Sequence, residues 1–432
     1  MRPTLAKAGT SAACAIAVAI ICAGCTSSPP HPSAPAGGTV GASATAGTVS
    51  PAAPPLPARS LPSPACDTAT APSAALTGVR TAMVPVPGSP FGVAAAPEGR
   101  WAFLAVTGGV EVLRTGGSLA PAVVRTIPVA GVPAGVIITP DGRYLLVAAG
   151  RGAVVISLAR AERGTAGAVL GTLSALGRGA LDDSAIEVAV SPDGQFAFVT
   201  LEYADRAVVF NLGEALRTGF GAAGYVGSVP LGQAAVGMAV SPDGRWLYAT
   251  SEVGQSRRSP AVLPAAGQPG TLTVIDLRRA ETDPASSVVA TVDAGCQPVR
   301  VITSADGSEV WVTARASDDL LCFSAARLVS DPAHDLVAIV RVGEAPVGLA
   351  AVHGGSLIVV ADSNRFGAGG AVAGLDVVNV AAALSGGRAV AGHISSGSFP
   401  REMAVLRDGT LLVSDYASGQ LEAVDVASIP GG

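Results

Sequence analysis

Three charged residues stand at the same place in three copies of a repeated phrase, and their side chains are of types that can do chemistry. Glu187, Arg300 and Glu402 each lie seven residues before a turn glycine, and Arg401 precedes Glu402. A carboxylate can act as a general acid or base, and a guanidinium can bind an anion or stabilise an oxyanion. These four residues are the candidate ligand-binding residues. The alternative is a salt-bridged plug in which the charges only satisfy one another.

The other four copies have glycine at this position. They are Gly92, Gly135, Gly237 and Gly348. If all copies converge on one axis, space is short at this level, and glycine is the residue that fits. A charged side chain there lies in a narrow and partly dry space, where desolvation is costly unless the charge is paired.

The rest of the chain carries no recognised catalytic or metal-binding motif. The phrase G-x-G-x-x-G at Gly219, Gly221 and Gly224 lacks the strand–turn–helix setting of a nucleotide site, so we interpret it as a loop. The four histidines are far apart in the sequence. We therefore assign no catalytic residue, and we predict no cofactor and no metal site.

The repeat itself predicts the fold. Its turn glycines recur at intervals of 43 to 63 residues: Gly99, Gly142, Gly194, Gly244, Gly307, Gly355 and Gly409. In each copy the turn joins a short apolar run to a run rich in β-branched and aromatic residues, and further apolar runs follow. This pattern indicates an all-β fold, a seven-bladed β-propeller with four antiparallel strands per blade. The seventh copy lacks a fourth strand, and we expect residues 79–87 to supply it and close the ring.

The N-terminal part of the chain predicts export. Residues 1–24 have a basic start and an apolar core of signal-peptide length. They are followed by Cys25 in "CAGC", which resembles a bacterial lipobox and implies lipidation of Cys25. Residues 25–77 are rich in Pro, Ala and Ser and predict a disordered tether, and residues 78–432 form the propeller. We expect a lipid anchor on the outer face of the bacterial cytoplasmic membrane. Ordinary secretion and a retained anchor helix are the alternatives.

The cysteines predict one disulfide, and the net charge argues against one class of partner. Beyond the signal region the chain has Cys66, Cys296 and Cys322, which allow one disulfide in an oxidising compartment. We predict the pair Cys296–Cys322, because both belong to the fifth copy, and the alternative is Cys66–Cys296. The net charge of -5 and the lack of a Lys/Arg cluster argue against nucleic acid as a partner. We expect a monomer that contacts the membrane only through its lipid.

Two connections between second and third strands are unusually long. They span residues 252–270 and 362–374, and both should overhang the same end of the propeller. Charged residues of the loops at this end either join the site or are ordinary solvated loop charges: Arg257, Arg258, Arg315, Arg365, Glu202, Glu252, Asp362 and Asp415.

The repeat resembles the YVTN-type and lactonase-like seven-bladed propellers. The resemblance is carried by a "PxGVxxxPDG" phrase, an aromatic-rich second strand, and "VxVIDL", here Leu272–Leu277. Two functions are open. One is a binding module for a small polar ligand, an envelope polymer or a protein partner. The other, which the resemblance implies, is hydrolysis of a sugar or related lactone, with Arg300 stabilising the oxyanion and a glutamate activating water. We favour the binding module, because no site motif of the family matches residue by residue.

Overall fold

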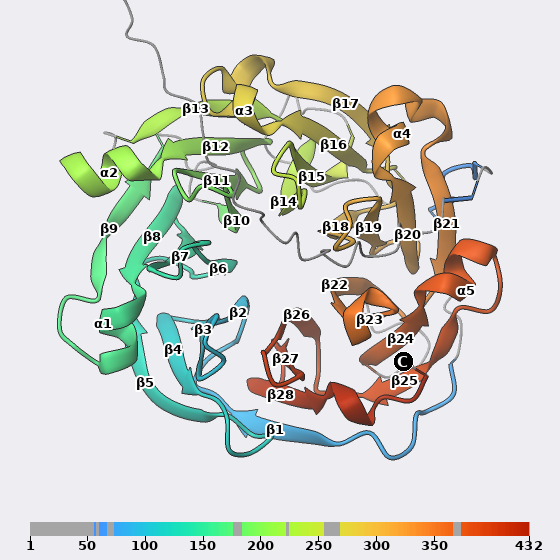
Figure 1. Ribbon diagram of the computed structural model, residues 1–432, viewed down its shortest axis with the longest axis horizontal. Helices are drawn as coiled ribbons and strands as arrows, with labels where there is room; N and C mark the ends of the chain where they lie inside the picture. Colours follow the sequence, from blue (N-terminus) through green and yellow to red (C-terminus); the bar gives the residue numbers. More distant parts are fainter. Residues whose placement is uncertain are drawn as a thin grey trace, which may run out of the picture. The chain divides into compact units, whose positions relative to one another are not determined.

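The computed structural model describes residues 56–57, 60–66, 73–175, 184–221, 224–254, 268–365 and 373–431. In this part of the chain, seven four-stranded antiparallel sheets stand around one axis (Figure 1). The predicted seven-bladed β-propeller is confirmed. The predicted signal segment, Cys25 and most of the predicted tether lie outside the described residues.

The strands of each blade follow one another from the centre of the ring outward. The inner strands are β2 (Val93–Ala95), β6 (Val136–Ile138), β10 (Ala185–Val190), β14 (Gln233–Val240), β18 (Pro298–Thr303), β22 (Pro346–Val352) and β26 (Pro400–Val405). The second strands are β3 (Trp101–Val106), β7 (Tyr144–Ala149), β11 (Phe196–Leu201), β15 (Trp246–Val253), β19 (Glu309–Ala314), β23 (Leu357–Asp362) and β27 (Thr410–Asp415). The third strands are β4 (Gly109–Arg114), β8 (Gly152–Ser157), β12 (Arg206–Asn211), β16 (Thr271–Asp276), β20 (Asp319–Ser324), β24 (Gly374–Asn379) and β28 (Gln420–Asp425). The outer strands are β5 (Ala122–Pro128), β9 (Val169–Ser174), β13 (Tyr225–Pro230), β17 (Val288–Asp293), β21 (Leu336–Arg341), β25 (Val390–Ser395) and, in blade 7, β1 (Thr81–Pro85).

The first strand of the domain closes the ring, as the sequence predicts. β1 pairs antiparallel with β28, from Thr81 opposite Val424 to Pro85 opposite Gln420. In Figure 1 the N-terminal β1 lies beside the C-terminal β28. Because one blade is shared by both ends of the propeller, blade 7 has no unpaired third strand that could template association with another chain.

The repeated phrase forms the hairpin that joins the inner strand to the second strand. All seven turn glycines have a positive φ, between 68° and 92°, which glycine reaches without strain. In blade 3 the Ser191 hydroxyl donates to the carboxylate of Asp193 and accepts from the backbone N–H of Phe196. The turn is therefore held by its own side chains as well as by its glycine.

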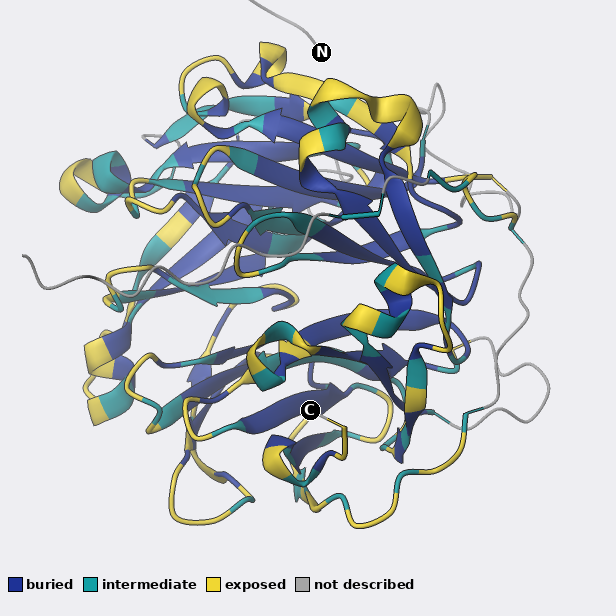
Figure 2. Ribbon diagram, turned by 45° about the vertical axis from the view of Figure 1, so that its right-hand side comes forward, coloured by how far each residue is buried: buried dark blue, intermediate teal, exposed yellow. Residues whose placement is uncertain are grey.

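The core lies between neighbouring blades. In β11, Ala197 and Val199 pack with Leu146 of blade 2, whereas Phe198 packs with Leu247 of blade 4. Both faces of the sheet are buried in this way, so the second strands are continuous apolar runs instead of alternating ones. Figure 2 shows buried strands and exposed helices at the rim.

The described residues also include short helices that the sequence analysis did not predict. After the third strands come α1 (Leu158–Arg163), α2 (Leu212–Thr218), α3 (Leu277–Ala280), α4 (Ala325–Ser330) and α5 (Val380–Ser385), and the 3₁₀ turns are η2 (Pro284–Ser286), η3 (Pro332–His334), η4 (His353–Gly355) and η5 (Val426–Ser428). In α2 and α5 the last strand residue, Asn211 or Asn379, accepts a hydrogen bond from the backbone three positions on. These asparagines at the strand ends were the available signal, because such a side chain caps a helix. Within the described residues no helix is both long and apolar enough to cross a membrane.

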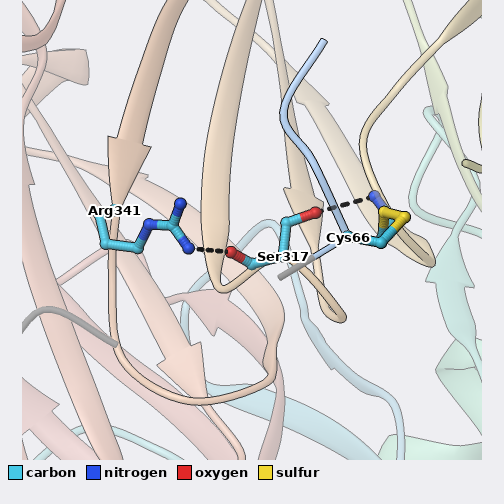
Figure 3. Close-up of a disulfide and its surroundings, with 4 residues drawn as sticks. Cys66, Ser317 and Arg341 are labelled. Atoms are coloured by element: carbon cyan, nitrogen blue, oxygen red, sulfur yellow. Dashed lines mark hydrogen bonds between the residues drawn. A yellow bond between two sulfur atoms is a disulfide. The ribbon is translucent and has the colours of Figure 1, made fainter. Parts of the chain in front are cut away.

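The disulfide joins Cys66 to Cys296, so the predicted pair Cys296–Cys322 is wrong. The Cα atoms of Cys66 and Cys296 are 5.3 Å apart. Cys322 is a free, fully buried thiol that packs between blades 5 and 6. Cys296 instead lies in the loop that enters blade 5, where its backbone N–H donates to Ser317 (Figure 3). Cys322 lies in β20 and faces blade 6, so its thiol does not reach the loop that holds Cys296.

The end of the predicted tether lies against the propeller. The backbone N–H of Leu61 donates to Leu336 of β21 at 3.0 Å, and that of Leu76 donates to His393 of β25 at 2.8 Å. The Ser73 hydroxyl donates to Asp376 at 2.6 Å. The described residues before β1 are thus bonded to blades 5 and 6, unlike the free tether that their composition predicts.

We predict that Cys66→Ser lowers the free energy of unfolding by about 2–5 kcal/mol, since it opens a cross-link between residues 230 apart in sequence. Dithiothreitol should lower the melting temperature of the wild type and leave that of Cys66→Ser unchanged. Cys322→Ala should keep the sensitivity to reductant. The Cys66–Cys296 assignment would be contradicted if dithiothreitol left the melting temperature of the wild type unchanged. It would also be contradicted if Cys322→Ala no longer responded to dithiothreitol.

Candidate functional site

The seven inner strands converge where they begin, and we call this end of the ring the mouth. Space there is as short as the sequence predicts. A methyl group on Gly135 would collide with the carboxylate of Glu187, and one on Gly348 would collide with the carbonyl oxygen of Arg401. Glycine at these positions lets one blade approach the backbone or side chain of the next.

Each inner strand of blades 3 to 7 is bulged at the mouth. The register of the pairing shifts between Ala185 and Glu187, Ala235 and Met238, Pro298 and Val301, Pro346 and Leu349, and Pro400 and Met403. These intervals contain or end at the seventh position before the turn glycine. A bulge turns a side chain away from its regular direction and leaves backbone groups without a ladder partner.

Hydroxyl side chains of the second strands satisfy these backbone groups and link the blades. Thr313 accepts from the N–H of Arg300 at 3.1 Å and donates to the carbonyl of Val347 in the next blade at 2.7 Å. The same arrangement occurs at Thr200, Thr250 and Ser414. We call these four residues the hydroxyl relay. It holds the backbone of Glu187, Arg300 and Glu402 in place.

The structure brings the three predicted charges together. Arg300 Nε donates to Glu402 Oε1 at 2.6 Å and lies 3.4 Å from Glu187 Oε2. The side chain of Arg300 is 7% exposed, and those of Glu187 and Glu402 are each 14% exposed. We call these residues the mouth triad. Three blades far apart in sequence supply it, because their bulges point toward the same axis.

One guanidinium serves two carboxylates in this triad. Burial disfavours the charge of Arg300, but Glu402 and Glu187 raise its pKa above the ordinary value. Burial raises the pKa of Glu187 to about 7, against the effect of Arg300 and together with that of Glu402. Arg300 hydrogen-bonds to Glu402 at 2.6 Å, so Glu187 is the carboxyl that we expect to hold a proton. With that proton the triad is electrically neutral.

Arg401 has a different environment from the triad. Its guanidinium carbon lies 3.7 Å from the ring centre of Phe91, 5.4 Å from that of Phe399 and 5.5 Å from that of Tyr416. We call these three rings the aromatic box. Arg401 Nε is buried, and among the described residues it has no hydrogen-bond partner. Burial and then Arg300 lower the pKa of Arg401 to about 10.

Sequence reasoning missed the aromatic box. Phe91 occupies in blade 1 the position that Arg401 has in blade 7, and Phe399 lies two residues before Arg401. Phe399 has φ 57°, and the equivalent residues of blades 4 to 6 also have a positive φ, so this backbone conformation belongs to the repeat: Ala234, Gln297 and Ala345. The available signal was an aromatic residue next to the repeated proline, Phe91 beside Pro90 and Phe399 beside Pro400. These two rings come together only because blades 1 and 7 are neighbours in the closed ring.

A second ion pair lies at the mouth. Arg315 donates to Glu252 at 2.8 Å, and their side chains are 8% and 9% exposed. These two residues are therefore not the solvated loop charges that the alternative interpretation describes. Burial, followed by Glu252, raises the pKa of Glu202. Arg365 is exposed and lies 5.6 Å from the ring centre of Phe399, while Arg257 and Arg258 fall outside the described residues.

Asp362 and Asp415 are buried beside the loops that enter blades 6 and 7. Asp362 is buried, and burial and then Asp376 raise its pKa. The hydroxyl of Ser396, in the loop between blades 6 and 7, lies 3.0 Å from Asp415 and 2.6 Å from Glu422. One hydroxyl proton serves one acceptor, so the other contact needs a proton on a carboxyl. Burial raises the pKa of both Asp415 and Glu422 to about 7, which agrees with a neutral carboxyl in this pair.

No group of three or more His, Cys, Asp or Glu side chains in the described ranges is arranged to hold a metal ion.

We predict that Arg300→Met lowers the free energy of unfolding by about 3–5 kcal/mol, because it leaves the buried acids Glu187 and Glu402 without their cation. The triple variant Glu187→Gln/Arg300→Met/Glu402→Gln should recover most of this loss, since it removes all three charges. Urea unfolding measures both, with the exposed Arg143→Gln as control. Equal losses in the single and triple variants would show that the triad is not a mutually compensating unit.

A second prediction concerns the acid pair of blade 7. The pKa of Asp415 and Glu422 is about 7 in the folded state and near 4 in an unfolded chain. The folded state therefore binds more protons between pH 4 and 7, and stability falls as pH rises through this range, by about 1.4 kcal/mol per pH unit for each proton.

The stability of the variant Asp415→Asn/Glu422→Gln should fall less steeply with rising pH than that of the wild type. Its melting temperature at pH 8 should therefore be higher. Melting curves at several pH values measure the difference, and Glu98→Gln, at an exposed position, is the control. A double variant with the same pH profile as the wild type would contradict the raised pKa values.

Comparison with known structures agrees with this architecture. A chain of hydrazine synthase from Kuenenia stuttgartiensis matches with a TM-score of 0.59 at 14% identity, covering 82% of this chain and 99% of that one. The Cps50 (Swd1) β-propeller domain of Myceliophteria thermophila matches with a TM-score of 0.58 at 13% identity, covering 80% and 100%. A functionally unknown protein from Desulfotomaculum acetoxidans DSM 771 matches with a TM-score of 0.53 at 13% identity, covering 72% and 87%. Identities this low show the fold alone.

Sequence comparison is more specific. A search of curated proteins found no match. The family model described as lactonase, seven-bladed beta-propeller, matches residues 104–366, which is more than half of the chain. The matched range contains Glu187 and Arg300, and Arg401 and Glu402 lie beyond it. The chain belongs to the family of seven-bladed β-propeller lactonases.

Proposed function

We propose that this propeller is an extracytoplasmic binding module, anchored through Cys25, that holds a small polar ligand at the mouth. The observation that carries the proposal is Arg401, whose buried Nε has no hydrogen-bond partner among the described residues. The mouth triad balances its own charges, but Arg401 rests on rings that bear no charge. A buried donor without an acceptor costs free energy, and a ligand oxygen removes that cost.

The proposal assigns different roles to the four candidate residues. Arg401 is the ligand-contacting cation. Glu187 is a second polar contact, because its proton can be donated to a ligand oxygen. Arg300 and Glu402 hold Glu187 in position and form the floor of the mouth. The polar group that binds can also belong to a larger molecule, such as an envelope polymer or a protein segment.

The alternative function is hydrolysis of a sugar or related lactone. Family membership supports it, and so does the pKa of Glu187, which at about 7 suits a general base near neutral pH. In this reaction the ionised Glu187 takes a proton from water, and the resulting hydroxide attacks the lactone carbonyl. The ring oxygen then leaves and receives the proton from Glu187. Arg401 is better suited than Arg300 to the oxyanion, because Arg300 is already shared by two carboxylates.

A thermal-shift screen tests the proposal. We expect a sugar acid, sugar lactone, phosphate or envelope glycan to raise the melting temperature of the wild type and not that of Arg401→Gln, because a ligand stabilises only the form that binds it. Arg143→Gln, which also removes an arginine from an aromatic ring, is the matched control. Lactone turnover that is lost in Glu187→Gln would establish the hydrolase, whereas shifts that Arg401→Gln leaves unchanged would place binding elsewhere.

A further inference from the structure

Two arginines lie near the same ring at the mouth. The guanidinium carbon of Arg401 is 5.4 Å from the ring centre of Phe399, and that of Arg365 is 5.6 Å from it. Arg365 comes from the loop after β23 in blade 6, whereas Arg401 and Phe399 belong to the start of blade 7. Within the described parts of the chain, neither arginine is paired with a carboxylate.

This arrangement is electrostatically unfavourable by itself. Burial and then Arg300 lower the pKa of Arg401, and Arg365 and Arg315 act in the same direction, against the opposite effect of Glu402. The rings compensate in part, because a guanidinium is attracted to an aromatic face. This attraction is weaker than the cost of taking a charged group out of water, so the rings do not replace a counter-ion. An anion from solution would supply the missing charge and an acceptor for Arg401 Nε.

The walls and floor of the site narrow the kind of anion. Phe91, Phe399 and Tyr416 present apolar ring faces and edges, which suit a flat or short apolar body. The floor contains the mouth triad, whose charges balance one another, so it offers no net positive charge to a second negative charge on the ligand. A carboxylate matches the fork of a guanidinium with two parallel hydrogen bonds and carries one charge. Glu187, when protonated, can donate to it.

We infer that the ligand of the mouth is an organic monocarboxylate with a flat or compact apolar body, held by Arg401 and Arg365 beside Phe399. This inference rests on the proposed binding function and specifies its ligand class. The carboxylate lies nearest Arg401, at the buried end of the site, and Arg365 approaches from the exposed rim. The apolar body packs against Phe399 and Tyr416.

Calorimetric titration of the purified protein with four probes tests this inference. Benzoate and cyclohexanecarboxylate should bind, and the neutral isostere benzamide should not. Inorganic phosphate should bind at least about tenfold more weakly than benzoate, as expected for a dianion above a floor without net positive charge. Arg401→Gln should weaken benzoate binding about tenfold or more, and Arg365→Gln by less, since Arg365 is exposed. Arg143→Gln should leave binding unchanged.

Each contrary result has a distinct meaning. Benzamide binding as tightly as benzoate, or benzoate binding that survives Arg401→Gln, would overturn the carboxylate assignment. Phosphate binding more tightly than benzoate would do the same and would indicate a phosphorylated ligand. If a neutral lactone or glycan binds in an Arg401-dependent way and no carboxylate does, this inference fails while the proposed function stands. If no probe and no member of the screen binds, both fail.

Should Arg401→Gln not fold, Phe399→Leu provides a second measurement. This variant keeps both arginines and shortens one wall of the aromatic box, so benzoate should lose affinity while the preference over benzamide remains. A Phe399→Leu variant that binds benzoate as tightly as the wild type would overturn the placement beside this ring.

Discussion

The convergence of seven inner strands at the mouth is the constraint on which the rest of this protein depends. So many strands begin around one axis that a side chain at that level meets the next blade, as the contacts of Gly135 and Gly348 show. Bulges in blades 3 to 7 relieve the crowding but remove ladder partners from backbone N–H groups. The hydroxyl relay restores some of these hydrogen bonds and, with the same oxygen atoms, links blade 3 to 4, 4 to 5, 5 to 6 and 7 to 1. The same crowding therefore determines both how the blades contact one another and how the site is arranged.

The bulges and the hydroxyl relay explain how charged side chains are accommodated at the narrow mouth. Where a bulged position bears glutamate or arginine, the relay holds its backbone and the side chain meets its opposite across the axis. The mouth triad then pairs its charges internally. Arg401, one residue earlier than Glu402, has no such partner and lies among aromatic rings. Glu402 is thus paired within the triad, whereas the neighbouring Arg401 is the residue to which we assign the proposed ligand. Membership in a lactonase family is consistent with either use of the site, because a propeller can carry many chemistries at its mouth.

The repeat predicted the blades, their order and the closing strand because each blade is a local hairpin pattern in which turn, strand length and apolar run agree. The same comparison of copies found Glu187, Arg300 and Glu402, because equivalent positions of a ring face one axis. It missed the aromatic box, since Phe91 and Phe399 belong to different copies at different positions and meet only after blade 7 closes against blade 1. It also chose the wrong partner for Cys296, because sequence distance does not report that Cys322 faces blade 6.

The sequence by itself determined the all-β class, the sevenfold repeat, the closure by the N-terminal strand, and the ring position at which charges gather. These follow from local propensity and from periodicity, which any segment expresses without knowledge of the others. The tertiary structure alone decided which charges are paired, which cysteine meets Cys296, and that Arg401 has rings instead of a carboxylate around it. Those outcomes depend on distances of a few ångströms between residues up to 310 positions apart, as for Phe91 and Arg401, and only the closed ring sets such distances.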